Sequence, residues 1–289
     1  MASTVRAAEA LPSVSIDTIE PTATVGAVTP ARRGGVLGRI NIVSWRLIAL
    51  AAFLVVWHLA SIPAGKLLLP SPIDIVPAFI DELRTGQLET AFLSSLQVFL
   101  VGYLLAVASG IALGVLMGGM PRVGATLEIY VNALNATPRV AFIPFIILWF
   151  GLGPVAKIVV VWFQAVLPIV INTYAGVQNT DPDLLEAARS FGARRGQLFR
   201  YIMLPGALPY VVTGLRLGAA MAMVGTVIAE LQTALAGLGY LMAQYNGTFQ
   251  TAKYFGPVIV LAVMGMLISQ ALKVVENRLA RWKSTREVS

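Results

Sequence analysis

The chain has 289 residues, of which 57% are hydrophobic and only 12% are charged, and its net charge at pH 7 is +7. A soluble protein of this length does not need so apolar a composition to build its core, so the composition indicates a chain that resides in a lipid bilayer. With no cysteine and a single histidine, the sequence excludes disulfides, thiolate metal sites and cysteine nucleophiles, and it provides no imidazole cluster for a metal.

Residues 1–40 are rich in Ala, Ser, Thr, Pro and Val and show no sustained helical period. This composition predicts a disordered cytoplasmic tail, to which we assign no function. We expect no cleaved signal peptide, because the first apolar run begins too far into the chain and is too long for the apolar region of a signal.

Six apolar stretches are each long enough to cross a bilayer, which needs about 20 apolar residues per helical crossing. They cover residues 42–62, 91–119, 125–150, 155–178, 206–231 and 256–277. We therefore expect an all-α membrane protein with about six transmembrane helices. Residues 41–90 would hold the first helix and an external loop, residues 91–281 the main transmembrane domain, and residues 282–289 a cytoplasmic tail.

The third stretch is interrupted by polar residues and a proline: Asn132, Asn135, Pro138 and Arg139. Proline removes a backbone donor and clashes with the preceding helical turn. Two structures fit this interruption: one kinked helix, or a short helix followed by a spanning one.

The distribution of Lys and Arg predicts the orientation, because positively charged loops resist translocation. With six spans, the loops on one side hold Arg32, Arg33, Arg39, Arg122, Arg189, Arg194, Arg195, Arg200, Arg278, Arg281, Lys283 and Arg286. The other side offers chiefly Lys66, Arg84 and Lys253. We therefore expect both termini in the cytoplasm. Topology and anionic lipid account for the net positive charge, so no nucleic-acid partner is needed.

Small residues recur every four positions on two of the predicted spans. They are Gly102, Ala106, Gly110, Gly114 and Gly118 on the second, and Gly214, Gly218 and Ala222 on the fifth. Such stripes allow helix backbones to approach closely in a membrane. The sequence leaves two interpretations open: packing within the chain, or a seam between two copies.

The loop at 181–205 carries clear helix signals. Asp181 is a good N-cap, Pro182 falls at the first helical position, and Gly192 is placed to end the helix in a left-handed conformation. A second amphipathic stretch, residues 197–203, runs to Leu204 and Pro205, where we expect the next spanning helix to begin. The loop therefore reads as a helix, a glycine turn and a helix.

The same loop matches every fixed position of the pattern E-A-A-x3-G-x9-I-x-L-P. The matching residues are Glu186, Ala187, Ala188, Gly192, Ile202, Leu204 and Pro205. In the large basic loop of a multi-span protein, this pattern resembles the EAA motif of ABC importer permeases. The resemblance covers the chain from about residue 85 to the C-terminus. It implies a location in the bacterial inner membrane and the five-helix core of a type I importer permease, to which the first span is an N-terminal addition.

The resemblance also implies partners and coupling residues. Two copies of an ABC ATPase subunit, a periplasmic or extracellular solute-binding protein and a second copy of the permease would complete the transporter. The ATPase contact would be made by Glu186, Ala187, Ala188, Gly192, Leu204 and Pro205, surrounded by Arg189, Arg194 and Arg195. Segments 137–158, 172–193 and 229–242 further resemble permeases for nitrate, sulfonates, taurine, bicarbonate and certain vitamin precursors, without choosing among these solutes.

Charges within spans are expensive and are therefore candidates for function. Arg139 follows a proline in the interrupted stretch, where freed backbone groups would line a cavity, and an anionic solute would meet a cation there. Pairing with Glu128, or extension of Arg139 to an interface, remains an equal alternative. Weaker substrate-path candidates are Asn135, Gln164, Asn172 and Thr173, since such residues more often form interhelical hydrogen bonds than bind a ligand.

Arg216 and Glu230 both fall within the fifth predicted span. They are fourteen residues apart, about 21 Å at 1.5 Å per residue in a helix. We therefore predict that these two charges do not pair with each other.

These observations predict the permease subunit of an ATP-driven ABC importer that moves a small anionic solute such as a sulfonate, taurine or nitrate. The sequence has no G-x-x-x-x-G-K-[ST] motif, so we expect ATP hydrolysis on a separate subunit, and neither a cofactor nor a metal in this chain. One alternative is an ion-driven secondary transporter, although only Glu128, Glu230 and Glu276 approach the spans. A second alternative, an intramembrane enzyme, lacks a cluster of catalytic side chains.

Overall fold

The computed structural model describes residues 42–233 and 235–279. The predicted tails at 1–40 and 282–289 lie outside the described residues. The chain divides into two compact units, residues 1–50 and residues 51–289. The boundary falls inside the first helix, so every later helix lies wholly within the second unit.

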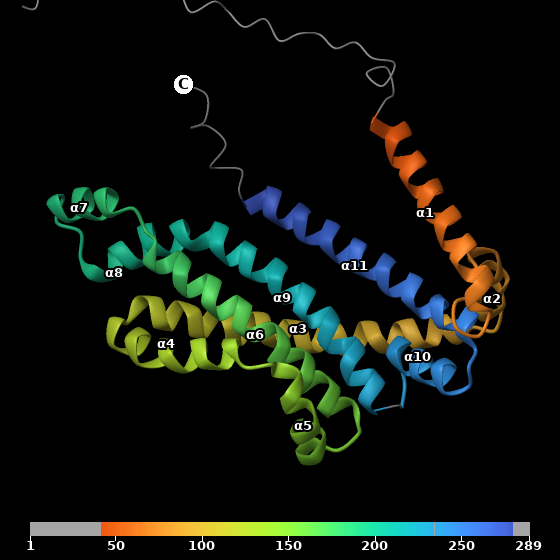
Figure 1. Cartoon of the computed structure of the whole chain (residues 1–289). Helices are drawn as coiled ribbons and strands as arrows, with labels where there is room; N and C mark the ends of the chain where they lie inside the picture. Colours follow the sequence, from red (N-terminus) through yellow and green to blue (C-terminus); the bar gives the residue numbers. More distant parts are fainter. Residues whose placement is uncertain (1–41, 234, 280–289) are drawn as a thin grey trace, which may run out of the picture. The chain divides into compact units, whose positions relative to one another are not determined.

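The described residues form helices joined by short connections, with no strand among them, which confirms the predicted all-α class (Figure 1). The α-helices are α1 Ile42–Ala64, α2 Pro72–Arg84, α3 Gln87–Gly119, α4 Pro121–Ala136, α5 Ile143–Phe150, α6 Pro154–Gln178, α7 Pro182–Ser190, α8 Arg195–Leu198, α9 Leu204–Thr233, α10 Leu238–Gly247 and α11 Thr251–Leu279. A 3-10 turn, Arg139–Phe142, precedes α5, and a π turn, Phe199–Met203, joins α8 to α9.

Five of the described helical segments are long and apolar enough to cross a membrane, and a sixth span is possible if one bent helix pair is counted. The five are Ile42–Ala64, Gln87–Gly119, Pro154–Gln178, Arg195–Thr233 and Thr251–Arg278. The count agrees with the prediction of about six. Two shorter helices, α2 and α10, had no counterpart among the predicted spans.

The third predicted span is broken. α4 and the segment Arg139–Phe150 meet at an angle of 90°, and α5 has only 8 residues. A helix of that length rises about 12 Å and cannot cross a bilayer. The expectation of a short helix followed by a spanning one is therefore wrong, and the segment is a sharply bent pair of short helices. Pro138 causes the break, because it forces extended backbone on the residue before it, and Thr137 has φ −81° and ψ 138°.

The core of the chain is α6, packed between α3 on one side and α9 on the other (Figure 1). Both small-residue stripes face α6. On α3, Gly110 lies against Ile169 and Gly114 against Thr173; on α9, Gly218 lies against Ile169 from the other side. Because α6 of the same chain occupies the space beside these glycines, the interpretation as packing within the chain is confirmed.

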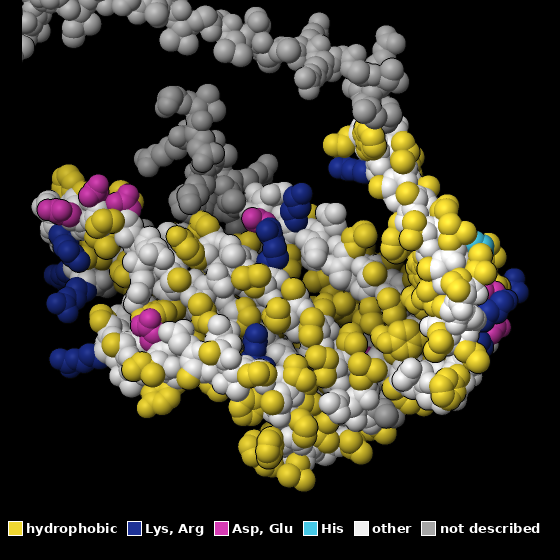
Figure 2. Space-filling view, viewed as in Figure 1, with side chains coloured by type: hydrophobic (Ala, Val, Ile, Leu, Met, Phe, Trp, Pro, Cys, Tyr) yellow, Lys and Arg dark blue, Asp and Glu magenta, His cyan; other side chains and the backbone are white. Residues whose placement is uncertain are grey.

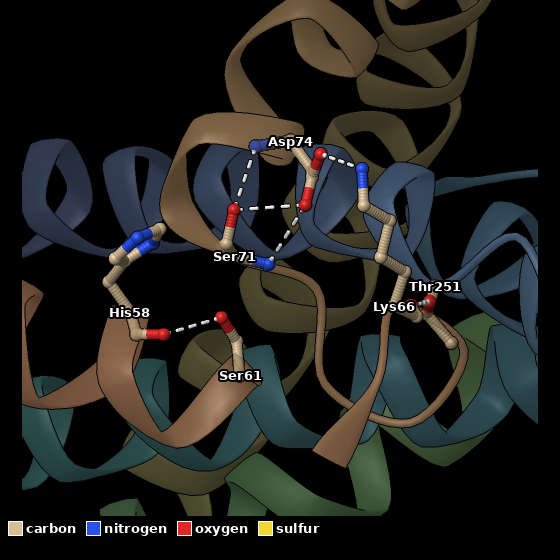
Figure 3. Close-up of polar contacts among 6 residues, drawn as sticks. All are labelled: His58, Ser61, Lys66, Ser71, Asp74 and Thr251. Carbon is tan, nitrogen blue, oxygen red and sulfur yellow. Dashed lines mark hydrogen bonds and ion pairs between the residues drawn. The ribbon is translucent and has the colours of Figure 1, made fainter. Parts of the chain in front are cut away.

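The far end of the molecule from α7 is built by α2, α10 and the start of α11. Ser71 caps α2, and its hydroxyl and the Asp74 carboxylate form a reciprocal capping box. Lys66 Nζ donates to Asp74 Oδ1 at 2.9 Å, and this bond lowers the pKa of Asp74 (Figure 3). Thr251, at the start of α11, donates to the Lys66 carbonyl at 2.8 Å and ties the two segments together.

Glu82 is the unusual residue of α2, because its side chain is buried. It is 1% exposed and faces Gly256 of α11, and neither carboxyl oxygen has a hydrogen-bond partner among the described residues. Burial raises the pKa of Glu82 above its usual value. The uncharged carboxyl is the form that this environment favours.

Substitution of Gly114 by Ala tests the close packing of α3 on α6. A Cβ at this position would lie 2.6 Å from Thr173 Cβ and 2.8 Å from the Val170 carbonyl oxygen. We expect Gly114→Ala to destabilise the chain by about 1–3 kcal/mol, as overpacking does, measured by thermal unfolding in detergent. The control is Gly206→Ala in α9, which meets nothing within 4 Å and should be neutral or slightly stabilising. Equal stability of the two variants would contradict this packing.

Glu82 should make stability depend on pH. Its pKa is raised in the folded state, so its contribution is fully present below its unfolded pKa and is lost as pH rises through the folded pKa. We expect Glu82→Gln to raise the unfolding temperature at pH 7–8 and to flatten its decline above about pH 4.5. Glu89→Gln, at an exposed carboxylate in the first turn of α3, is the control. An unchanged pH profile in Glu82→Gln would refute the buried uncharged carboxyl.

Candidate functional site

The predicted start and end of the loop helix are confirmed by α7. The Asp181 side chain accepts a hydrogen bond of 2.9 Å from the Asp183 N–H, and Pro182 is the first helical residue. The helix ends at Ser190, and Gly192 adopts φ +79°. Two backbone bonds close the turn, from Gly192 N to Arg189 O at 2.8 Å and from Ala193 N to Ala188 O at 3.0 Å. A side chain at Gly192 would be strained in this conformation.

α7 has an apolar face but buries none of its residues within the chain. Leu184 is 51% exposed, and Phe191, just after the helix, is 92% exposed. Acidic side chains gather on α7, while basic side chains lie on the segment that follows it (Figure 2). Amphipathic helices bury their apolar face against a neighbour, and the described chain provides none here. The arrangement suits docking to another protein.

Five residues of the EAA motif lie on this surface or line the hollow beside it: Glu186, Ala187, Ala188, Gly192 and Ile202. Glu186, Ala187 and Arg189 are exposed on α7, and Arg194 and Arg195 are exposed beyond the glycine turn. Between the two helical parts lies a hollow of about 360 Å³, lined by Ala188, Phe191, Gly192, Ala193, Gln197, Leu198, Tyr201 and Ile202. The small side chains Ala187 and Ala188 leave the backbone of α7 accessible to a partner.

The predicted helix start at Leu204–Pro205 agrees with the first residue of α9, Leu204, but the helical segment before it does not end there. The chain is helical without a break over 39 residues, Arg195–Thr233, and passes through Pro205. Pro205 has no N–H for the Tyr201 carbonyl, which would break an ordinary α-helix. The π turn Phe199–Met203 absorbs this proline, and its last bond runs from the Leu204 N–H to the Phe199 carbonyl, five residues back.

Arg139 lies at the break between α4 and α5 and reaches two other helices. Its Nη1 donates a hydrogen bond of 2.7 Å to the backbone carbonyl oxygen of Gln164 on α6, and its Nη2 lies 4.0 Å from Met221 Sδ on α9. The Gln164 carbonyl is available because Pro168, four residues later in α6, has no N–H to donate to it. A proline thus creates the acceptor that holds the guanidinium.

The alternative partner of Arg139 is engaged elsewhere. The Glu128 carboxylate accepts a hydrogen bond of 3.1 Å from the Tyr174 hydroxyl, and among the described residues it forms no ion pair with Arg139. Arg139 is half-buried, so the described chain does not fully enclose this residue.

The other substrate-path candidates do not gather around Arg139 as side chains. The Gln164 side chain is 4% exposed and packs under Gly225 of α9. Asn172 donates to the Pro168 carbonyl of its own helix at 2.8 Å. Thr173 is fully buried against α3, and Asn135 is exposed near the end of α4. Gln164 joins Arg139 through its backbone alone.

A buried polar cluster near the end of α9 was not foreseen. Glu230 is fully buried, and Ser95 Oγ of α3 donates to both of its carboxylate oxygens, at 2.8 and 2.9 Å. The Gly239 N–H donates to Glu230 Oε2 at 2.9 Å, and the Leu238 N–H donates to Ser95 Oγ at 2.8 Å. Glu230 therefore holds the first turn of α10 against α3.

Lys157 of α6 completes this cluster. It is 3% exposed, and its Nζ donates to the Ala236 carbonyl at 2.8 Å. Gly237 has φ +109°, and a Cβ there would collide with the Glu230 carboxylate. The sequence signal for this site was an acidic residue followed by two glycines, Gly237 and Gly239, but the partner residues Ser95 and Lys157 are too distant in sequence to identify.

Arg216 forms an ion pair with Glu276 of α11. The prediction that Arg216 does not pair with Glu230 is confirmed, because Glu230 belongs to the cluster with Ser95 at the opposite end of α9. The ion pair links α9 to α11 on the half of the helix nearer α7.

Comparison with known protein families gives one match over most of the chain. Residues 110–284 match the family described as "Binding-protein-dependent transport system inner membrane component". The match includes the EAA motif, Arg139 and the Glu230 cluster except for Ser95.

Several curated proteins are similar over most of their length. A putative aliphatic sulfonates transport permease protein, SsuC, of Bacillus subtilis (strain 168) is 33% identical over 76% of this chain and 79% of its own. The formylaminopyrimidine transport permease protein ThiX of Halalkalibacterium halodurans is 32% identical over 80% of this chain and 92% of its own. The taurine transport system permease protein TauC of Escherichia coli (strain K12) is 31% identical over 65% of this chain and 69% of its own.

Two solved structures share the fold. The inward-facing MetNI methionine ABC transporter has a chain with a TM-score of 0.54 and 22% identity, covering 65% of this chain and 93% of that chain. An amino acid ABC transporter with histidines has a chain with a TM-score of 0.53 and 19% identity, covering 72% of this chain and 95% of that chain. At these identities the likeness concerns the fold alone.

Proposed function

The chain belongs to the family of binding-protein-dependent transport system inner membrane components, and from this membership we propose which solute it carries, where its ATPase docks and how the two are linked. It is the non-catalytic, multi-span permease subunit of an ABC importer. This membership disfavours both alternatives, the ion-driven transporter and the intramembrane enzyme.

The solute that we propose is a small organic anion of the sulfonate type, such as taurine or an alkanesulfonate. Relatives that are 31–33% identical are named for aliphatic sulfonates and taurine. Arg139 supports an anion, because its half-buried guanidinium is held by a neutral carbonyl rather than a carboxylate and so keeps its positive charge uncompensated. A sulfonate offers three acceptor oxygens to such a fork of donors.

The ATPase subunit docks on α7 and the glycine turn. The observation that carries this proposal is that α7 is amphipathic yet buries no residue within the chain. The exposed Phe191 and Leu184 supply apolar contact area, Glu186 supplies a charged acceptor, and Arg194 and Arg195 form a basic rim. In an interface these apolar groups would leave water.

α9 transmits the movement of the ATPase to the membrane. The helical segment Arg195–Thr233 has 39 residues and is about 58 Å long at 1.5 Å per residue. One end adjoins the docking turn, and the other ends at the Glu230 cluster. When ATP binding draws the ATPase subunits together, their pull on residues 181–205 tilts this helix and changes the side to which the cavity opens.

The complete importer would contain two copies of this permease, two ATPase subunits and one external solute-binding protein. With the basic loops inside, both termini face the cytoplasm, and the end built by α2 and α10 faces outward. The binding protein delivers the solute at that outer end. No cofactor or metal is required of the permease, since ATP is hydrolysed on the partner.

A glycine substitution tests the docking site. Gly192→Val places a β-branched residue at φ +79°. This raises the conformational energy of the turn by roughly 1–2 kcal/mol, or the turn changes its shape. We expect about 10-fold weaker binding of the partner ABC ATPase subunit, measured by co-purification and by titration in nanodiscs. Gly196→Ala is the control, because Gly196 is also exposed but has no positive φ and meets nothing within 4 Å. If ATPase binding is equal in both variants, the docking turn lies elsewhere.

Neutralising Arg139 tests the anion site. We expect Arg139→Gln to lower taurine- or alkanesulfonate-stimulated ATP hydrolysis about 10-fold or more, because a charged hydrogen bond is worth ~1.5–3 kcal/mol. Arg139→Lys, which keeps the charge, should retain part of the stimulation and separates loss of charge from loss of folding. Arg122→Gln, at an exposed cation of α4, is the control. A folded Arg139→Gln variant with normal stimulation would rule out this role.

A further inference from the structure

The turn between α10 and α11 contains a backbone conformation that its residue does not favour. The Gln250 N–H donates to the Tyr245 carbonyl at 2.9 Å, and the Phe249 N–H donates to the Asn246 carbonyl at 3.3 Å. These two bonds define a Schellman ending, in which the residue at the Phe249 position is left-handed and is usually Gly. Phe249 has φ +56°.

Phe249 stands apart from the other left-handed residues. Within residues 42–233 and 235–279, the remaining positions of positive φ are all glycines: Gly65, Gly86, Gly151, Gly192 and Gly237. A bulky side chain with positive φ is strained. The rest of the fold thus uses glycine wherever the chain turns this way, and the single exception is an aromatic residue.

Packing within the chain does not compensate this strain. Phe249 is 71% exposed, so its ring is left largely outside the fold. Its neighbours Thr248 and Gln250 are polar and exposed, and the Gln250 amide donates to the Thr248 hydroxyl at 3.2 Å. The turn therefore presents one aromatic ring surrounded by uncharged polar groups.

The position of the ring favours a protein partner over lipid. Two ion pairs surround the same end of the molecule: Lys66 with Asp74, and Lys253 with Asp81. Lys66 is joined to this turn by the hydrogen bond from Thr251 (Figure 3). Exposed charges of this kind lie in water rather than hydrocarbon. Phe249 therefore projects from an aqueous surface, where its exposed ring does not stabilise the chain by itself.

We infer that Phe249 is an anchor for the external solute-binding protein, inserted into an apolar pocket of that partner when it docks on the permease. This inference rests on the proposed function. The strained backbone is explained if the aromatic ring that it presents is buried only in the complex. Buried aromatic residues surrounded by polar groups contribute much of the binding free energy of protein interfaces. The exposed Leu67 and Leu68, next to Lys66, would extend the apolar contact.

The decisive variant is Phe249→Gly, because stability and docking should change in opposite directions. Glycine relieves the left-handed strain, so the unfolding temperature should rise. Docking should weaken, with the half-saturating concentration of binding protein for stimulation of ATP hydrolysis raised about 10-fold or more. The measurement uses the full complex in nanodiscs, with the partner ATPase and binding-protein subunits and with taurine or ethanesulfonate as solute. Basal hydrolysis without binding protein should stay unchanged, and Phe249→Tyr should retain docking.

The outcomes separate this inference from the proposed function. A normal half-saturating concentration in Phe249→Gly, with wild-type stimulation intact, overturns the anchor and leaves the importer assignment standing. The anchor is also overturned if docking stays normal while Phe249→Gly lowers the unfolding temperature in nanodiscs, since the ring would then be contacting lipid. If the wild-type complex shows no stimulation by any binding protein, the proposed function fails and this inference fails with it.

Discussion

The close approach of three helix backbones is the constraint on which this structure depends. Lipid tails are as apolar as Leu, so burial of apolar surface does little to hold spans together, and dense packing must do so. Gly110 and Gly114 bring α3 onto one side of α6, and Gly218 brings α9 onto the other. With α6 held between them, the Gln164 carbonyl is fixed at the height where Arg139 reaches it. The contact between Arg139 and this carbonyl therefore depends on the absence of side chains at the three glycines.

α9 connects the two ends of the molecule. At one end the π turn Phe199–Met203 joins it without a break to α8, which follows the glycine turn at Gly192. At the other end Glu230 accepts hydrogen bonds from α3 and from the first turn of α10. Burying a carboxylate costs free energy unless its oxygens are hydrogen-bonded, so these bonds favour this arrangement of the three helices. In the proposed mechanism, a force applied at the turn around Gly192 is carried by one continuous helical segment to a cluster that also involves α3, α6 and α10.

Local features of the chain were predictable where a few neighbouring residues decide the outcome. The N-cap at Asp181 and the glycine turn at Gly192 depend on residues adjacent in sequence, and both lie as predicted. The break at Pro138 was also visible, but its 90° angle was not, because that angle depends on what α4 and α5 pack against. The start of α9 at Leu204 was also predicted, but the π turn that joins it to α8 without a break was not.

The sequence by itself determined the membrane environment, the helical class, the small-residue stripes and the EAA motif, because composition, periodicity and spacing are properties of the chain alone. Only the tertiary structure decided that the stripes face α6, that Arg139 bonds to a carbonyl freed by Pro168, and that Ser95 and Lys157 belong to the site of Glu230. These contacts join residues far apart in sequence, and several spans of similar hydrophobicity offer equivalent faces. Which faces meet is settled by shape and by satisfied hydrogen bonds, which exist only after the helices have packed.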